Sequence, residues 1–227
     1  MDWQALLLTV KLDLVVCALL LLLGVPLASW LAFCRWRWKF LLEAIVALPL
    51  VLPPTVLGFY LLLAMGPHSP LGKAYGWAWG RGLPFTFAGL VIASVIYSLP
   101  FMVQPIAAAF AGVDPKLLAA SAVLGASRLR TFWQIIVPIS WTGLLTGLVL
   151  TFAHTLGEFG VVLMVGGNIP GVTRTVSISI YDNVQALDYT TAGNTSLVLL
   201  VSSFVILSLV YAMNRTGTLL WPARRLG

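Results

Sequence analysis

Charge is the scarcest property of this chain: of its 227 residues only 9% are charged, whereas 60% are hydrophobic and the mean hydropathy is +0.99. Soluble globular domains carry about 25% charged residues, so the composition excludes that class and predicts a chain that faces lipid. The net charge of +6 comes from short basic clusters between apolar runs. A nucleic-acid partner is therefore not expected, because it would require a continuous basic surface.

Cysteine and histidine are also rare, with two of each. Cys17 and Cys34 would lie about 25 Å apart on one helix, too far for a disulfide, and we expect two buried thiols. The chain lacks the P-loop of ATP-binding proteins, a metal-ligand cluster and a nucleophile-elbow motif. Ser98 and His154 could form an intramembrane nucleophile and base, but nothing in the sequence orients them. We expect no enzyme activity, metal or cofactor in this chain.

Long hydrophobic runs are abundant. Five runs are long enough to cross a hydrocarbon core that requires about 20 helical residues, and they predict spans near 10–34, 42–65, 86–110, 138–158 and 192–213. The first run ends in a basic cluster and not in a cleavage site, which favours a retained helix over a secretion signal. Because no repeat or linker divides the chain, we expect an all-α polytopic membrane protein with a single transmembrane domain over 1–227.

The basic residues predict the orientation of these spans. One group lies between the first two spans, between the third and fourth, and after the fifth: Arg35, Arg37, Lys39, Lys116, Arg128, Arg130, Arg215, Arg224 and Arg225. The smaller group on the opposite side is Lys11, Lys73, Arg81 and Arg174. By the positive-inside rule the larger group is cytoplasmic, with the N-terminus outside and the C-terminus inside.

The segment 111–137, between the third and fourth spans, begins with the signals of a short helix. Asp114 is a suitable N-cap, and Pro115 suits the first helical position. The helix is expected to reach Leu124 and to end at Gly125, since glycine readily adopts the left-handed conformation found after helix ends. The small residues between these ends would allow another protein to approach closely.

A second short helix carrying Arg128 and Arg130 is expected next, and Pro138 opens the fourth span. An ordinary helix stop at Gly125, with arginines that merely follow the positive-inside rule, is the alternative interpretation of this segment.

The segment resembles the signature of ABC importer permeases, which is Glu-Ala-Ala, three residues, Gly, nine residues, then Ile-x-Leu-Pro. Here the residues Ala119-Ala120-Ser121, Gly125 and Ile135-Ile136-Val137-Pro138 keep both spacings. The chain departs from the signature at Ala119, where the family usually has Glu, and at Ser121 and Val137. The resemblance implies a type I ABC importer permease fold in which this loop docks on a cytoplasmic ATPase. The residues expected at that contact are Ala119, Ala120, Ser121, Ala122, Gly125, Ala126, Ser127, Arg128 and Arg130.

The resemblance also implies the rest of an import machine in the cytoplasmic membrane of a prokaryote. Two copies of the permease would pair, and two cytoplasmic ATPase subunits would bind ATP and Mg. An extracytoplasmic oxyanion-binding protein would deliver the substrate, and ATP binding would drive alternating access.

Two further segments resemble the molybdate branch of these permeases. They cover 48–58, with Pro53-Pro54-Thr55, and 156–175, with Gly157-Glu158-Phe159-Gly160 and Asn168-Ile169-Pro170-Gly171. Sulfate permeases share the Gly-Glu-aromatic-Gly pattern but match the second stretch less closely. The resemblance implies import of molybdate or tungstate, with sulfate or thiosulfate as the alternative. A secondary transporter is less favoured, because matched halves are absent from the sequence.

Prolines interrupt the second predicted span. Pro49, Pro53 and Pro54 remove backbone donors, and non-helical backbone at membrane depth is tolerated where it is buried in protein or lines a watery cavity. Pro53, Pro54 and Thr55 are therefore candidate gate residues, with a packing kink as the alternative.

The fourth predicted span has a polar face, because Thr151, His154, Thr155 and Glu158 recur every three or four residues. The hydroxyls of Thr151 and Thr155 are candidate pore donors, unless they bond their own backbone. Because a carboxylate repels an oxyanion, we expect Glu158 to be structural at the outer end, pairing with Arg174 or capping a helix.

Two carboxylates and one segment are interpreted only from their position in the sequence or from the periodicity of their hydrophobic residues. Asp13 and Glu43 lie near predicted span ends, where solvated or interfacial carboxylates are expected. The outer segment 173–187 has both strand-like and helical periodicity, so it could be either.

Overall fold

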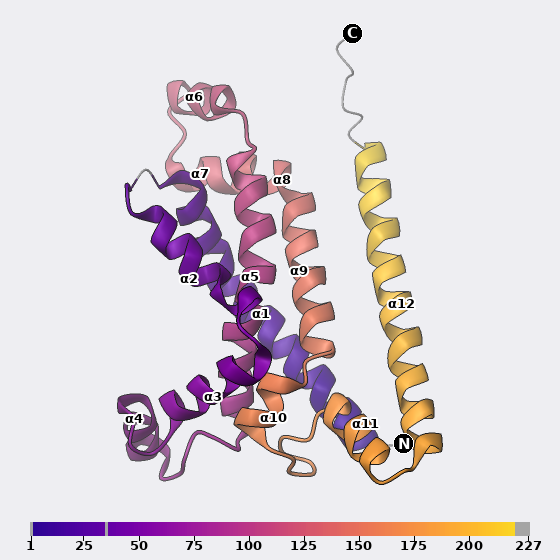
Figure 1. The fold of residues 1–227 in the computed structure, drawn as a ribbon. Helices are drawn as coiled ribbons and strands as arrows, with labels where there is room; N and C mark the ends of the chain where they lie inside the picture. Colours follow the sequence, from indigo (N-terminus) through magenta and orange to yellow (C-terminus); the bar gives the residue numbers. More distant parts are fainter. Residues whose placement is uncertain (1, 35, 221–227) are drawn as a thin grey trace.

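The computed structural model describes residues 2–34 and 36–220, excluding the side chains of 209, 210 and 213–220. Within this part of the chain every regular element is a helix (Figure 1), which confirms the all-α prediction. The helices are α1 (Trp3–Phe33), α2 (Lys39–Val51), α3 (Pro54–Met65), α4 (Pro70–Trp79), α5 (Phe87–Ala111), α6 (Pro115–Val123), α7 (Arg128–Thr131), the π-helical η1 (Phe132–Ile136), α8 (Val137–Ile139), α9 (Trp141–Leu156), α10 (Gly160–Gly166), α11 (Val176–Gln185) and α12 (Tyr189–Leu220).

Three helices are long and apolar enough to cross a membrane by themselves: α1, α5 and the Tyr189–Ser208 part of α12. Two further spans are broken. Helices α2 and α3 meet at 114°, and the segment Arg128–Ile139 meets α9 at 72°. The prediction of about five spans fits this arrangement. The second span is interrupted at the prolines, as expected, whereas the bend before α9 in the fourth was not expected.

Helix α5 lies between α1 and α9 and packs along both. The shared core includes Leu12 and Val16 from α1 with Val103 and Ile106 from α5. Helix α9 approaches α5 closely at Gly147, where an added Cβ would lie 2.9 Å from the Met102 carbonyl oxygen. Because lipid tails are as apolar as these side chains, close packing at small residues is what holds such helices together.

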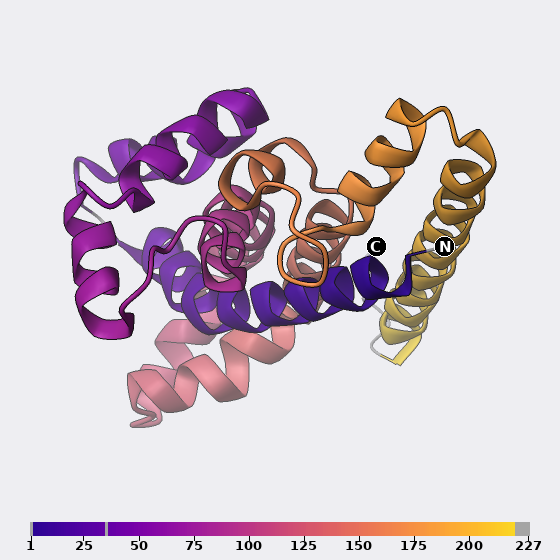
Figure 2. The same cartoon turned by 90° about the horizontal axis from the view of Figure 1, so that it is seen from below.

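The molecule has two distinct ends (Figure 1). Helices α6 and α7 and the last turns of α12 lie at one end, whereas the N-terminus, α4, α10 and α11 lie at the other. Helix α12 stands to one side, also when the molecule is viewed along its length (Figure 2), and it contacts α11 and α9. These positions group the predicted cytoplasmic loop apart from the predicted outer loops.

The helix signals read in segment 111–137 are confirmed. Asp114 accepts a hydrogen bond from the Lys116 N–H at 2.8 Å, and α6 begins at Pro115. The helix ends at Val123 with Leu124 as its C-cap, and Gly125 follows with a left-handed φ of +74°. The second short helix, α7, is capped by Ser127.

Two sequence-based expectations are corrected by the packing. Asp13 is not at a span end: it lies inside α1 and is completely buried. Cys17 is buried as expected, but Cys34 is only half-buried, and both thiols are free.

Candidate functional site

A cavity of about 650 Å³ opens where two helix breaks meet. One break separates α2 from α3, and the other separates α9 from α10. The lining residues are Pro54, Thr55, Tyr97, Ala153, His154, Gly157, Glu158, Phe159, Gly160, Leu163 and Met164. The predicted gate residues Pro54 and Thr55 therefore lie on this cavity, next to Pro53 at the break.

The first break follows from proline chemistry. Leu52 and Pro53 each precede a proline, which favours extended backbone, and their ψ angles are 134° and 138°. Pro54 then occupies the first position of α3, where its missing N–H costs nothing. The proline pair ends one helix and starts another, so the chain changes direction beside the cavity.

The second break is a feature that the sequence-based prediction missed. Helix α9 ends at Leu156, Gly157 to Phe159 are non-helical, and α10 begins at Gly160. The closely spaced Gly157 and Gly160 are the feature of the sequence that could have predicted this break. A Cβ on Gly160 would lie 2.8 Å from the Pro54 Cβ, so the two breaks pack directly on each other.

The predicted pore threonines lie behind the cavity wall. Thr151 and Thr155 are both buried and are not among the lining residues. The Thr155 hydroxyl is 2.9 Å from the Ser98 hydroxyl, which is also 2.9 Å from His154 Nδ1. His154 is the member of this group that reaches the cavity, where it stacks on Phe101.

The hydrogen bond between Ser98 and His154 corrects the expectation that nothing orients this pair. Ser98 is completely buried and shares its hydroxyl with Thr155. The pair is thus a packed polar contact between α5 and α9.

Glu158 forms part of the cavity wall, yet its carboxylate is buried in the protein, and neither oxygen has a hydrogen-bond partner. The predicted pairing with Arg174 is wrong, because Arg174 contacts other carboxylates.

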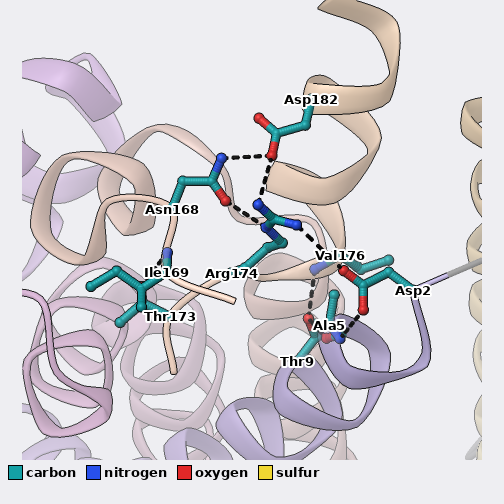
Figure 3. A network of polar contacts seen from close by, with 9 residues as sticks. All are labelled: Asp2, Ala5, Thr9, Asn168, Ile169, Thr173, Arg174, Val176 and Asp182. Carbon is teal, nitrogen blue, oxygen red and sulfur yellow. Dashed lines mark hydrogen bonds and ion pairs between the residues drawn. The ribbon is translucent and has the colours of Figure 1, made fainter. Parts of the chain in front are cut away.

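Arg174 is the centre of a polar network at the end of the molecule that carries the N-terminus (Figure 3). Its Nε donates to Asn168 Oδ1 at 2.6 Å, and its two terminal nitrogens lie 3.5 Å from Asp182 and 4.0 Å from Asp2. Asn168 in turn donates to Asp182 at 2.6 Å, and Asp2 caps α1 by accepting from the Ala5 N–H. Arg174 thereby joins the start of α1, the loop after α10 and α11.

A buried hydrogen bond reinforces this junction. The Thr9 hydroxyl of α1 accepts from the Val176 N–H at 2.8 Å, at the first residue of α11. The segment 173–187, for which strand and helix were both possible, is therefore helical over Val176–Gln185.

The loop at the opposite end is held together by a buried polar contact and exposes two apolar side chains. The Ser121 hydroxyl is 3.0 Å from the Thr131 hydroxyl, which ties α6 to α7. Val123 and Leu124 are 87% and 85% exposed. Of the residues predicted to contact another protein, Ser121 is buried and Ala126 is half-buried, and the following are exposed: Ala119, Ala120, Ala122, Gly125, Ser127, Arg128 and Arg130.

Comparison with known proteins identifies the class. Residues 24–216 match the family described as binding-protein-dependent transport system inner membrane component, and the chain belongs to that family. It is thus a multi-pass transporter permease of the inner membrane.

Within this family, the chain is similar to individual molybdenum and sulfate permeases. The chain is 49% identical to the molybdenum transport system permease protein ModB of Azotobacter vinelandii, over 94% of this chain and 95% of that one. It is 41% identical to the putative molybdenum transport system permease protein YvgM of Bacillus subtilis, over 82% of each chain. It is 34% identical to a probable sulfate transport system permease protein of Zygnema circumcarinatum, over 83% of this chain and 65% of that one.

A solved structure shares the fold. This is a bacterial ABC transporter involved in the import of the acidic polysaccharide alginate, with a TM-score of 0.74 and 19% identity, over 95% of this chain and 80% of that one. The type I importer permease fold implied by the signature loop is consistent with this match.

Proposed function

We propose that this protein is the pore-forming permease subunit of an ATP-driven importer that moves molybdate, or the similar tungstate, into a prokaryotic cell. The observation that carries the proposal is the cavity between two broken spans, in a chain 49% identical to a molybdenum transport permease. Helix breaks at membrane depth are characteristic of transporter substrate sites.

The lining of the cavity suits transient contact with an oxyanion. Thr55, Tyr97 and His154 offer polar groups that can donate hydrogen bonds, and the N-terminus of α3 adds the positive end of a helix dipole. The lining residues include no lysine or arginine. A tetrahedral anion can therefore be stabilised there without being trapped by an ion pair.

The exposed loop at the other end suits an ATPase partner. Val123 and Leu124 project beside the left-handed Gly125, and exposed apolar residues rimmed by polar ones mark protein-binding sites. In this proposal two permease copies pair, and two ATPase subunits that bind ATP and Mg dock on these loops. The positive-inside rule then places this end in the cytoplasm and the N-terminus outside.

The outer end would receive an oxyanion-binding protein. A choice among tetrahedral oxyanions depends largely on that protein, and sulfate or thiosulfate import is the competing function, since one relative is a probable sulfate permease. A secondary transporter is disfavoured because coupling would have to arise within this chain alone.

Reconstitution tests the proposal. We would place the full chain with its ATPase and binding protein in liposomes and measure ATP-dependent uptake of labelled molybdate, with excess sulfate as competitor. Gly125→Arg should abolish uptake, because it places a bulky side chain on the docking loop at a left-handed φ. Gly80→Arg is the matched control: Gly80 also has a left-handed φ of +67°, with open space around it, but lies at the outer end.

Uptake that needs ATP, resists sulfate and is lost only in the Gly125 variant is the expected result. If excess sulfate abolished the uptake, the chain would still be an importer, but its substrate would be sulfate. Uptake without ATP or the ATPase would overturn the importer itself.

A further inference from the structure

The ring of His154 is held in the cavity wall by three side chains of α5. It stacks on Phe101 with the ring centroids 4.0 Å apart, and it meets the edge of the Tyr97 ring at 4.5 Å. Its Nδ1 lies 2.9 Å from the hydroxyl of Ser98, which is completely buried. Because these contacts restrict rotation of the ring, its two nitrogens keep separate environments.

The second ring nitrogen, Nε2, is open to the cavity. His154 lines the cavity and is half-buried. Among the described residues Nε2 has no hydrogen-bond partner, and it is not one of the buried atoms that lack a partner. No ion pair in the same part of the chain joins the ring to Glu158, one helical turn further along α9. Nε2 is therefore the atom that the ring can offer to a ligand.

Behind the cavity wall, three polar groups share two contacts. Ser98 Oγ lies 2.9 Å from His154 Nδ1 and also 2.9 Å from the Thr155 hydroxyl. Both hydroxyls are buried, and within the described chain neither makes another hydrogen bond. Each hydroxyl supplies one hydrogen, and a neutral imidazole carries a hydrogen on only one of its nitrogens. The hydrogens in this group can therefore be counted.

The count favours one arrangement. If Thr155 donates to Ser98 and Ser98 donates to Nδ1, both hydroxyl hydrogens are used, and the imidazole hydrogen is on Nε2. If Nδ1 also carried a hydrogen, in the other tautomer or in a charged ring, three hydrogens would share two contacts. One buried hydroxyl would then have no acceptor, whereas buried polar groups nearly always have partners. A histidine tautomer is assigned from its hydrogen-bond network in this way.

We propose that the hydroxyls of Thr155 and Ser98 hold His154 neutral with its hydrogen on Nε2, so that Nε2 donates a hydrogen bond to the oxyanion in the cavity. Ser98 and Thr155 are positioning residues, since both are buried behind the wall. A neutral donor binds the anion without the ion pair that would retain it. The identity of the anion rests on the proposed function, whereas the tautomer does not.

The tautomer is measured without substrate. The purified full chain is placed in lipid nanodiscs with isotope-labelled histidine, and nitrogen NMR distinguishes protonated from unprotonated ring nitrogens. His68→Gln leaves His154 as the single histidine, because the sequence has two and His68 is exposed. We expect a protonated Nε2 and an unprotonated Nδ1. A hydrogen on Nδ1, alone or together with one on Nε2, overturns the proposal.

A serine variant tests the positioning role. Ser98→Ala removes the donor to Nδ1, so both tautomers should become populated. Ser202→Ala is the control, because the Ser202 hydroxyl bonds the Leu199 carbonyl of its own helix, α12, and its spectrum should match that of the parent chain. If Ser98→Ala also gave the parent spectrum, Ser98 would not set the tautomer and the positioning role would be wrong.

The contact with the anion is tested in the assembled importer. His154→Leu should lower the maximal rate of molybdate uptake about tenfold, the effect of losing one hydrogen bond to a charged group. His154→Gln should recover most of the rate, because its amide nitrogen can donate in place of Nε2. Uptake by His154→Leu at the parent rate overturns the contact.

A spectrum of the parent chain covers the case in which His154→Leu does not fold. Molybdate, but not chloride at equal ionic strength, should shift the Nε2 resonance, and an unchanged resonance overturns the contact. The proposed function fails separately: it is overturned if the unaltered importer takes up no molybdate with ATP, and that result leaves the measured tautomer unchanged.

Discussion

Gly160 packs directly against Pro54, so that a Cβ on the glycine would come within 2.8 Å of the proline Cβ. These residues begin α10 and α3, the two short helices that follow the breaks. The contact joins two distant parts of the sequence at the cavity, and it requires the absence of a side chain at position 160.

The first prediction tests this contact. Gly160→Ala should destabilise the protein by about 1–3 kcal/mol, as overpacking usually does, and should reduce transport, because the two breaks are forced apart. Gly193→Ala is the matched control: its Cβ would meet nothing within 4 Å, and Gly193 lies outside the cavity lining. Thermal unfolding and uptake are measured for both variants, and equal behaviour would show that the contact does not matter.

The second prediction concerns the bond between α1 and α11. Thr9→Val keeps the shape but leaves the Val176 N–H without its acceptor, which should cost about 1–3 kcal/mol. Thr146→Val should cost little, because the Thr146 hydroxyl is exposed and bonds its own helix at Thr142. Hydrogen exchange at the Val176 amide reports the loss directly; unchanged protection there would contradict the assignment.

The third prediction concerns the polar network around Arg174. Arg174→Ala should destabilise the protein by about 1 kcal/mol, the upper range for partly exposed ion pairs, and the loss should shrink in high salt. Arg174→Lys should recover only part of the stability, because lysine lacks the planar fork that reaches Asn168 and Asp182 together. Arg81→Ala, at an exposed position of the same end, should have almost no effect. The network has no structural role if all three variants unfold alike.

The fourth prediction concerns the docking loop. Leu124→Asp should leave folding intact and weaken association with the ATPase at least tenfold, because a charge is placed in an apolar contact. Leu187→Asp makes the same change at a similarly exposed leucine of the opposite end of the molecule and should leave that association unchanged. Affinity is measured by co-purification and by stimulation of ATP hydrolysis. Equal affinity in the two variants would place the ATPase elsewhere.

The helix boundaries of segment 111–137 could be predicted from sequence because their determinants are local. Asp114, Pro115 and Gly125 act on backbone within a few residues of themselves, through a side-chain cap, a fixed φ and a left-handed turn. No distant contact is required to fix where α6 starts and stops, so its boundaries agree with the prediction.

The cavity could not be predicted in the same way. Asp13 was expected near a span end because the first span was predicted to begin near residue 10. Helix α1 in fact begins at Trp3, which places Asp13 well inside it. The spacing of Thr9, Asp13 and Cys17 was a usable signal, but burial against α5 and α9 depends on how the helices pack. An ion pair between Glu158 and Arg174 was expected from their opposite charges alone, whereas the fold places Arg174 beside Asp2 and Asp182.

The central claim is that the oxyanion passes through the cavity at the two breaks, and a cysteine placed at Thr55 tests it most directly. In a chain with Cys17→Ala and Cys34→Ser, Thr55→Cys should react with a negatively charged thiol reagent. This modification should block molybdate uptake, and added molybdate should slow the modification. Tyr60→Cys, on α3 but outside the cavity lining, should leave uptake unaffected after the same treatment. If the Thr55 cysteine reacts fully while uptake continues unchanged, the path of the anion lies elsewhere.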